Sequence, residues 1–240
     1  MLFPRLQGVA RRLRGLSGSV PSQCAVCHAW PAQRLCKACT ARFAQPATRC
    51  QRCALRVPAG VGVCGACLRN PPAFDACLAA VDYAYPWADA LADFKFRGDP
   101  GWAATLAALL RSTPGVAPAL EAADRLLPIP LSVQRLRERG FNQSALLARR
   151  LERSKTDSRS LLRLHATETQ IGLSRARRLR NLRGAFALHP AQAAALHGQR
   201  LLLLDDVMTT GATLHAASLV LRAAGAARIT ALVLARTAAD

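Results

Sequence analysis

One stretch of thirteen residues constrains the fold more than any other part of this chain. The leucines of Leu201–Leu204 are followed by Asp205, Asp206 and a run of small and hydroxyl-bearing residues that ends at Thr213. An uninterrupted apolar run of this kind is typical of a strand buried on both faces, and such strands occur mainly in parallel sheets covered by helices. The sequence therefore predicts an α/β fold with a parallel sheet.

The residues that follow this strand predict a phosphate site. Asp205 and Asp206 can accept hydrogen bonds from vicinal hydroxyl groups or bind hydrated Mg²⁺. Gly211 lets the backbone close around an anion, and an apolar-periodic helix is expected from Leu214 to Ala224, with its N-terminus facing that anion. The loop comprises Val207, Met208, Thr209, Thr210, Gly211, Ala212 and Thr213.

This pattern resembles the loop with which type I phosphoribosyltransferases bind 5-phosphoribosyl-1-pyrophosphate (PRPP). The resemblance implies that the acidic pair holds the ribose hydroxyls and Mg²⁺ while the loop wraps the 5-phosphate. Nucleoside triphosphatases also have an apolar strand that ends in acidic residues, but they need a Gly-Lys-Ser/Thr phosphate loop. Lys37, Lys95 and Lys155 are the three lysines, and none of them follows a glycine, so that loop is absent.

Eight of the nine cysteines form four Cys-x-x-Cys pairs, a spacing that predicts metal binding. Two pairs complete a tetrahedral site, so two structural zinc ions are expected. The even gaps favour a double zinc ribbon in which consecutive pairs share an ion, with an interleaved cross-brace as the alternative. A disulfide framework is disfavoured because no secretion signal precedes the pairs. The expected ligands are Cys24, Cys27, Cys36 and Cys39 for one ion and Cys50, Cys53, Cys64 and Cys67 for the other. Cys77 is expected to be a buried apolar residue.

The chain is strongly basic, and its charge is clustered. The formal net charge is +19 and falls to about +15 when each Cys₄ site holds one Zn²⁺. Residues 1–70 contain eleven Arg or Lys and no Asp or Glu, and residues 131–183 contain fourteen against four. A bias in codon usage can explain why Arg is used in place of Lys, but it does not explain why residues 1–70 contain no Asp or Glu. The clustering predicts a polyanionic partner, with nucleic acid favoured over a membrane surface or no macromolecular partner.

The first twenty residues predict a basic amphipathic helix. Its apolar side chains recur at helical spacing from Leu2 to Leu16, with arginines on the opposite side. Three interpretations remain: the helix packs on its own protein, it contacts nucleic acid or an anionic membrane surface, or it is a transit peptide. The nucleic-acid interpretation rests on Arg11, Arg12 and Arg14. No segment approaches the ~18 consecutive apolar residues of a transmembrane span.

Strand and helix patterns alternate after the cysteines, which implies parallel crossovers. Strands are expected at 78–85, 125–129, 159–164, 201–204 and 229–234, and helices at 87–96, 102–110 and 214–224. Residues 114–118 are expected to form a loop. One continuous helix, capped by Ser132, is expected to run to Leu151.

Taken together, the motifs resemble the competence-associated ComF family. The resemblance is carried by Pro128, Pro130, Ser132, Arg135, Arg139–Gln143, Thr169, Gln170, Leu173–Arg175, Arg178, Asn181, Ala185 and Phe186, with the acidic strand and the cysteines. It implies a type I phosphoribosyltransferase-like parallel sheet flanked by helices and preceded by a small zinc-ribbon module. The expected parts are a basic helix at 1–20, a double zinc ribbon at 21–72 and the phosphoribosyltransferase-like domain at 76–240.

The family resemblance also implies site roles. The turn at Leu131 and Ser132, with Arg135 and Arg139, would face the pyrophosphate. Residues 167–183 match a mobile loop that closes over PRPP, and that segment is rich in arginine and has only one acid, at its start. Its expected contacts are Gln170, Arg175, Arg178 and Asn181.

The implied biological role is the handling of single-stranded DNA in the cytoplasm during DNA uptake and natural transformation. PRPP, DNA and the DNA-uptake machinery are then the expected partners, with peripheral contact at the inner face of the membrane as a further option. The alternative is a phosphoribosyltransferase that acts on a nucleobase or nucleotide without binding DNA. The sequence leaves catalytic turnover and the acceptor open.

Overall fold

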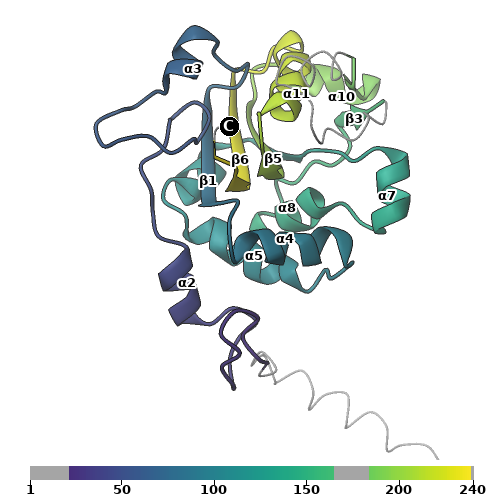
Figure 1. The fold of residues 1–240 in the computed structure, drawn as a ribbon. Coiled ribbons are helices and arrows are strands. Elements are labelled where there is room, and N and C mark those ends of the chain that lie inside the picture. The colour runs from purple at the N-terminus through teal and green to yellow at the C-terminus, as the bar shows by residue number, and fades with distance from the viewer. Residues whose placement is uncertain (1–21, 165–183, 239–240) are drawn as a thin grey trace, which may run out of the picture. The chain divides into compact units, whose positions relative to one another are not determined.

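The computed structural model describes residues 22–164 and 184–238 (Figure 1). Its contacts divide the chain after Phe43 into two units. The smaller unit contains the first four cysteines and a short helix, α2 (Lys37–Phe43). The larger unit begins at Ala44 and contains the other cysteines together with the α/β sheet. This division differs from the one expected at residue 72, because the second cysteine group packs with the sheet.

A four-stranded parallel sheet forms the core of the larger unit, with strand order β1-β6-β5-β2. All three pairings are parallel, as the alternating pattern predicts. The strands are β1 (Ala76–Asp82), β2 (Arg125–Pro128), β5 (Arg200–Met208) and β6 (Arg228–Arg236). The leucine run occupies the buried part of β5, and β6 beside it is buried over most of its length.

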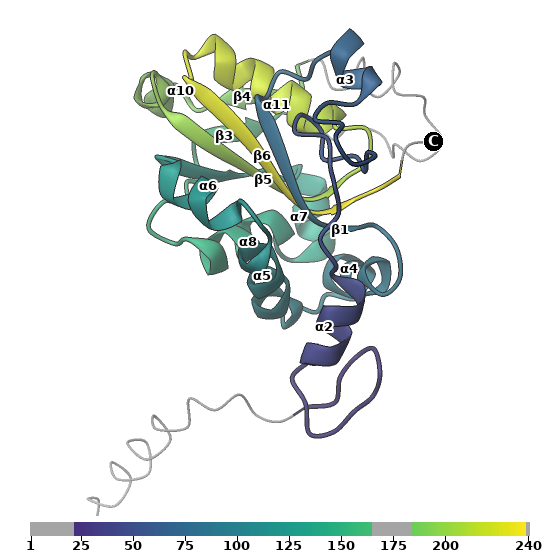
Figure 2. The same ribbon diagram turned by 90° about the vertical axis from the view of Figure 1, so that its left-hand side faces the viewer.

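Helices cover both faces of this sheet (Figure 2). One face carries α5 (Trp102–Ser112), α6 (Val116–Ala122) and α8 (Gln143–Leu151), and α4 (Trp87–Phe96) packs against α5. The other face carries α11 (Ala212–Ala223), which also contacts β4 (Phe186–Leu188). The remaining short helices are α3 (Gly65–Arg69), α7 (Val133–Arg139) and α10 (Pro190–Ala193), which runs into a 3₁₀ turn at Ala194–Leu196.

Two expectations about helices were wrong. Residues 114–118 do not form a loop throughout, because α6 begins at Val116 and accommodates Pro118 in its first turn. Proline is tolerated there because the first backbone N–H groups of a helix have no intrahelical partner. The helix expected from Ser132 to Leu151 is interrupted where Gly140 adopts φ +74° and ends α7. Asn142 then caps α8 by accepting a 3.2 Å hydrogen bond from the N–H of Ala145.

The strand expected at 159–164 forms, but outside the parallel sheet. It is β3 (Leu161–Arg163), which pairs antiparallel with β4. The sequence did not predict β4 or α10, since elements of three or four residues are too short to show a hydrophobic period. The bounds of α4, in contrast, match the expected helix at both ends.

The carboxyl ends of β2 and β5 lie side by side. Pro128 pairs with Leu204, and the N–H of Ile129 donates a 2.8 Å hydrogen bond to the Leu204 carbonyl. The turn after β2 and the acidic pair in β5 therefore share one edge of the sheet. Within the described ranges, every helix is too short or too polar to cross a membrane.

Candidate functional site

The acidic pair lies near the end of β5 and is held by groups from two helices. Asp206 is 8% exposed, and its Oδ1 lies 2.8 Å from Nζ of Lys95, which extends from α4. Asp205 is half-buried, and its Oδ1 accepts hydrogen bonds from Ser144 Oγ at 3.2 Å and from the N–H of Asp206 at 2.9 Å. Among the described residues no hydrogen bond reaches Oδ2 of either carboxylate, so two oxygens are available for hydroxyl groups or a cation.

Asp205 has an unusual protonation equilibrium. Burial, followed by the negative charge of Asp206, raises the pKa of Asp205 to about 7, although the charge of Lys95 opposes this shift. The carboxyl therefore exchanges between its neutral and ionised forms near neutral pH. A cation beside the pair would favour the ionised form, because an opposite charge lowers the pKa of a carboxyl group.

Arg139, at the end of α7, brings positive charge to the pair. Burial lowers the pKa of Arg139, while the charge of Asp206 acts to raise it. Its guanidinium donates to Gln143 Oε1 at 3.2 Å and lies 5.2 Å from the centre of the Phe96 ring. Stacking and hydrogen bonding thus fix the side chain of Arg139 near the acidic residues.

Arg163, on β3, also interacts electrostatically with Asp205 of the acidic pair. Burial lowers the pKa of its guanidinium, as does the positive charge of Arg135, whereas Asp205 acts to raise it. The guanidinium lies 5.3 Å from the centre of the Phe186 ring, across the β3–β4 pair. The acidic pair is therefore within electrostatic reach of basic side chains from several elements, an arrangement suited to a multiply charged anion bridged by Mg²⁺.

The turn after β2 is fixed from two sides. Ser132 is 3% exposed, and its Oγ accepts a 3.3 Å hydrogen bond from the N–H of Arg135, which confirms the predicted helix cap. Asn142 Nδ2 donates to the Ile129 carbonyl at 3.0 Å, and this bond ties the start of α8 to the base of the turn. The residues expected to face pyrophosphate are Leu131, Ser132, Arg135 and Arg139, and they follow β2 at the same edge as the acidic pair.

The predicted phosphate loop joins β5 to α11. Gly211 has φ +77°, and a Cβ atom there would lie 2.4 Å from Cε of Met208. The positive φ is the constraint that favours glycine here, since Cε of Met208 is the end of a flexible side chain and can move. The N–H of Ala212 donates a 3.4 Å bond to Thr210 Oγ1 where α11 begins. Thr209 is exposed, so the loop presents hydroxyl groups next to a helix N-terminus.

A buried arginine connects this loop to the second cysteine group. Arg236, at the end of β6, is 7% exposed, and its Nε donates to the Cys53 carbonyl at 3.0 Å. Its Nη1 donates to the carbonyls of Met208 at 3.2 Å and Thr237 at 2.7 Å, and also to that of Thr209. One guanidinium thus holds the backbone of a Cys-x-x-Cys turn and the backbone of the phosphate loop together.

The second cysteine group and the phosphate loop line a common cavity of about 580 Å³. Cys53 and Cys67 line it together with Thr210 and Gly211. His215 on α11 also lines it and accepts a 3.1 Å hydrogen bond at Nδ1 from the N–H of Ala73. The second cysteine group is therefore a direct neighbour of the phosphate loop.

The paired cysteines are grouped in sequential order rather than interleaved. One group is Cys24, Cys27, Cys36 and Cys39, and the other is Cys50, Cys53, Cys64 and Cys67. All Sγ atoms of a group lie within 4.8 Å of one another, and a 3.7 Å separation occurs in each, between Cys27 and Cys36 and between Cys53 and Cys64. Sulfurs at ~2.3 Å from a tetrahedral Zn²⁺ would be ~3.8 Å apart, so both groups fit zinc.

Backbone N–H groups support the sulfurs in both groups. The N–H of Cys36 points at Sγ of Cys24 at 3.4 Å, and the N–H of Cys64 points at Sγ of Cys50 at 3.3 Å. Such bonds favour the thiolate, the form that binds metal. Cys77 belongs to neither group, and its burial raises the pKa of the thiol to about 12, as suits a residue that serves as a small apolar side chain.

Several predicted contacts lie outside the described residues. They are Arg11, Arg12 and Arg14 in the first segment and Gln170, Arg175, Arg178 and Asn181 in the second. Their roles stay predictions.

Sequence reasoning missed four residues that shape this site: Lys95, Ser144, Arg163 and Arg236. None of them belongs to a motif. Lys95 approaches Asp206 only because α4 packs at the carboxyl edge, and Arg236 is one of many arginines until β6 is placed beside β5. The weak signal for Arg236 is a charged residue at the end of an otherwise apolar strand.

Comparison with known proteins assigns the chain to a family. The profile described as "Phosphoribosyl transferase domain" matches residues 113–240. The DNA utilization protein YhgH of Escherichia coli O6:H1 is 34% identical over 233 residues, which cover 91% of this chain and 99% of that protein. Competence protein F of Haemophilus influenzae is 34% identical over 179 residues (72% and 78%), and competence protein ComFC of Bacillus subtilis is 38% identical over 113 residues (47% and 44%). With a phosphoribosyltransferase domain over more than half of its length and such relatives along most of it, this chain belongs to the ComF family.

Proposed function

We propose that this protein binds Mg²⁺-PRPP at the carboxyl edge of its sheet. The proposal rests on the order of groups along β5 and into α11. Two carboxylates come first, whose Oδ2 atoms accept no hydrogen bond within the described part of the chain, and a loop closed by Gly211 follows. One group recognises a diol or a hydrated cation, and the other recognises a phosphate. PRPP carries a diol, a 5-phosphate and a Mg²⁺-binding pyrophosphate in one molecule.

The carboxylates of Asp205 and Asp206 then hold the ribose hydroxyls and the hydration shell of Mg²⁺. Charge-assisted hydrogen bonds of this kind are stronger than neutral ones. The ion pair with Lys95 neutralises the charge of Asp206 before PRPP binds, and the hydrogen bond from Ser144 orients Asp205. The loop from Val207 to Thr213 receives the 5-phosphate at the N-terminus of α11.

The pyrophosphate group lies toward the turn at Leu131 and Ser132, where Arg135 and Arg139 supply positive charge. Arg163 extends this positive surface from β3. If the protein turns over, these guanidinium groups stabilise the negative charge that develops on the departing pyrophosphate. Gln170, Arg175, Arg178 and Asn181 close over the bound molecule in this proposal, and the two zinc ions are structural.

We further propose that the protein handles single-stranded DNA in the cytoplasm during DNA uptake. The names of its relatives support this role, because they refer to DNA utilization and competence. The net charge of +19 supports a polyanionic partner. In this proposal Arg11, Arg12 and Arg14 contact the DNA backbone.

A single set of assays tests both parts. The zinc-loaded protein is incubated with Mg²⁺ and PRPP, alone and with single-stranded DNA or with free nucleobases, and pyrophosphate release is measured alongside DNA binding. DNA binding supports the DNA-handling part, and pyrophosphate release from PRPP supports the PRPP part. Release with nucleobases in a protein that does not bind DNA would instead establish the small-molecule phosphoribosyltransferase.

A further inference from the structure

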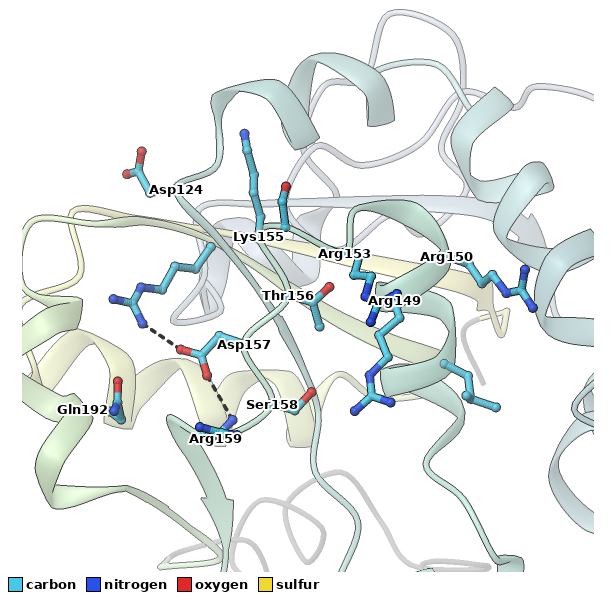
Figure 3. A pocket seen from close by; sticks show the side chains of 13 residues that line it. Asp124, Arg149, Arg150, Arg153, Lys155, Thr156, Asp157, Ser158, Arg159 and Gln192 are labelled. Atoms are coloured by element: carbon cyan, nitrogen blue, oxygen red, sulfur yellow. Dashed lines mark hydrogen bonds and ion pairs between the residues drawn. The ribbon is translucent and has the colours of Figure 1, made fainter.

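A second basic site lies at the opposite edge of the sheet from the phosphate loop. A groove of about 1050 Å³ opens where β2 begins and α8 ends, and six basic but only two acidic side chains line it (Figure 3). We call it the basic groove and define it by Arg149, Arg150, Arg153 and Arg159, with the hydroxyl groups of Thr156 and Ser158. None of these residues belongs to the PRPP site.

Both acids that line the basic groove are already neutralised. Asp124 pairs with Arg200 at 2.7 Å, an interaction that lowers the pKa of Asp124 to about 2. Asp157 pairs with Arg125 at 2.8 Å and also accepts a hydrogen bond from the N–H of Arg159. Neither carboxylate is therefore free to pair with the guanidinium groups around it.

The arginines that define the groove differ from Arg125 and Arg200, which pair with these acids. Among the described residues, no hydrogen bond or ion pair is formed by the side chains of Arg149, Arg150, Arg153 or Arg159. Lys155 differs, because its Nζ donates to the carbonyls of Leu120 and Glu121 at the end of α6. Figure 3 shows Arg149 and Arg159 on either side of Ser158.

The helix dipole does not account for this cluster. A negative C-terminal dipole favours Arg149 and Arg150, which lie in the last turn of α8. Arg159 lies eight residues beyond Leu151, the last residue of α8, where the dipole has no comparable effect. Four guanidinium groups that have no partner in the described part of the chain, in a groove also lined by Thr156 and Ser158, form a surface typical of phosphate contacts.

We propose that the basic groove binds the phosphate backbone of single-stranded nucleic acid. The groove is larger than most pockets for a single small molecule, and its cations are spread over a helix end and a loop, as several successive phosphates require. Its lining has no aromatic side chain on which bases could stack, so the contacts go to phosphates, which carry no sequence information, and binding should be insensitive to base sequence. This inference rests on the proposed DNA-handling function and gives it a location.

The basic groove is separate from the PRPP site. Arg200, which anchors Asp124 beside the groove, begins β5, and Met208 ends it. At about 3.3 Å per residue the two ends of this strand are ~26 Å apart. Nucleic acid in the groove and PRPP at the loop can therefore be bound at the same time, and each can be removed by mutation without the other.

The test compares the full-length, zinc-loaded protein with Arg149→Gln/Arg153→Gln and with a further variant that also carries Arg150→Gln and Arg159→Gln. Arg97→Gln/Arg137→Gln removes two positive charges elsewhere and is the charge-matched control for the double variant. Binding of oligo(dT) is measured by fluorescence anisotropy between ~50 and ~200 mM salt. Each lost phosphate contact should flatten the slope of log K against log[salt] by ~0.7, which is roughly 1.4 for the double variant and 3 for the quadruple one.

The inference is supported if the groove variants bind oligo(dT) more weakly and with a flatter salt dependence, while the control variant binds it as the wild type does and PRPP affinity is unchanged. If the wild type binds oligo(dT) and the quadruple variant binds it equally well, the groove assignment is overturned while the proposed function stands. If the wild type does not bind oligo(dT) at ~50 mM salt, DNA handling itself fails. If the variants still bind oligo(dT) but no longer bind vesicles that contain anionic lipid, the groove is a membrane contact and the inference is overturned.

Discussion

Substitution of Arg236 by methionine is expected to damage both stability and PRPP binding. Methionine keeps much of the side-chain volume but removes the donors to the carbonyls of Cys53, Met208, Thr209 and Thr237. The first three of these carbonyls belong to the Cys-x-x-Cys turn and to the phosphate loop, the two segments that Arg236 joins. At a net value of ~1 kcal/mol for each hydrogen bond, the loss is about 3 kcal/mol in the free energy of unfolding.

For a unit of this size, about 3 kcal/mol corresponds to a fall in Tm of roughly 6–12 °C. PRPP affinity should fall by tenfold or more, since a loop that is not held in place must be ordered during binding. Arg236→Lys should recover only part of both losses, because one ammonium group cannot reproduce the planar fork of guanidinium donors.

Differential scanning calorimetry and titration with Mg²⁺-PRPP measure these two effects. Arg228→Met, at the exposed start of the same strand, is the matched control and should change neither. An Arg236→Met protein whose Tm and PRPP affinity equal those of the wild type would refute the argument that this guanidinium positions the phosphate loop.

The other predictions concern the metal sites, the loop and the acidic pair. Cys53→Ser should reduce the zinc count in native mass spectrometry from two to one and lower PRPP affinity, whereas Cys77→Ala should retain two ions; an unchanged count in the first variant would contradict the ligand assignment. Gly211→Ala should weaken PRPP binding by about tenfold, because alanine is strained at φ +77°, and calorimetry tests this with Gly198→Ala, another glycine at positive φ with open space around it, as the control. Burial raises the pKa of Asp205 to about 7, so the folded state binds a proton that the unfolded state has released, and stability should fall as pH rises from ~4 to ~7. In Asp205→Asn this fall in the free energy of unfolding should be smaller. Urea unfolding of both proteins at pH 5 and pH 8 without Mg²⁺ measures it, and an equal pH dependence in the two proteins would count against the raised pKa.

Local patterns predicted the elements whose signals are contained within a few residues. The leucine run identified β5, Ser132 was placed as a helix cap, and the cysteine spacing indicated two groups of four ligands. Each of these signals depends on neighbours in the chain. The interruption at Gly140 was visible as a glycine but was outweighed by the apolar residues on both sides.

Contacts between distant segments were not predictable in the same way. Lys95 meets Asp206 across 111 positions only after α4 has packed at the edge of the sheet. Arg236 reaches Cys53 because β6 lies between β1 and β5, and strand order does not follow from the order of elements in the sequence. The division after Phe43 depends on the same contacts, because they join the second cysteine group to the sheet.

The most direct test of the account is isothermal titration of Mg²⁺-PRPP into the zinc-loaded protein and into Asp205→Asn and Asp206→Asn. Each substitution removes a charge-assisted contact worth roughly 1.5–3 kcal/mol, so affinity should fall by about ten- to a hundredfold. Asp89→Asn on α4 makes the same chemical change away from the pair and should bind normally. Thermal unfolding confirms that each variant is folded. PRPP binding by the wild type that persists unchanged in both acidic variants, or no binding by the wild type, would contradict the assignment of this edge of the sheet as a PRPP site.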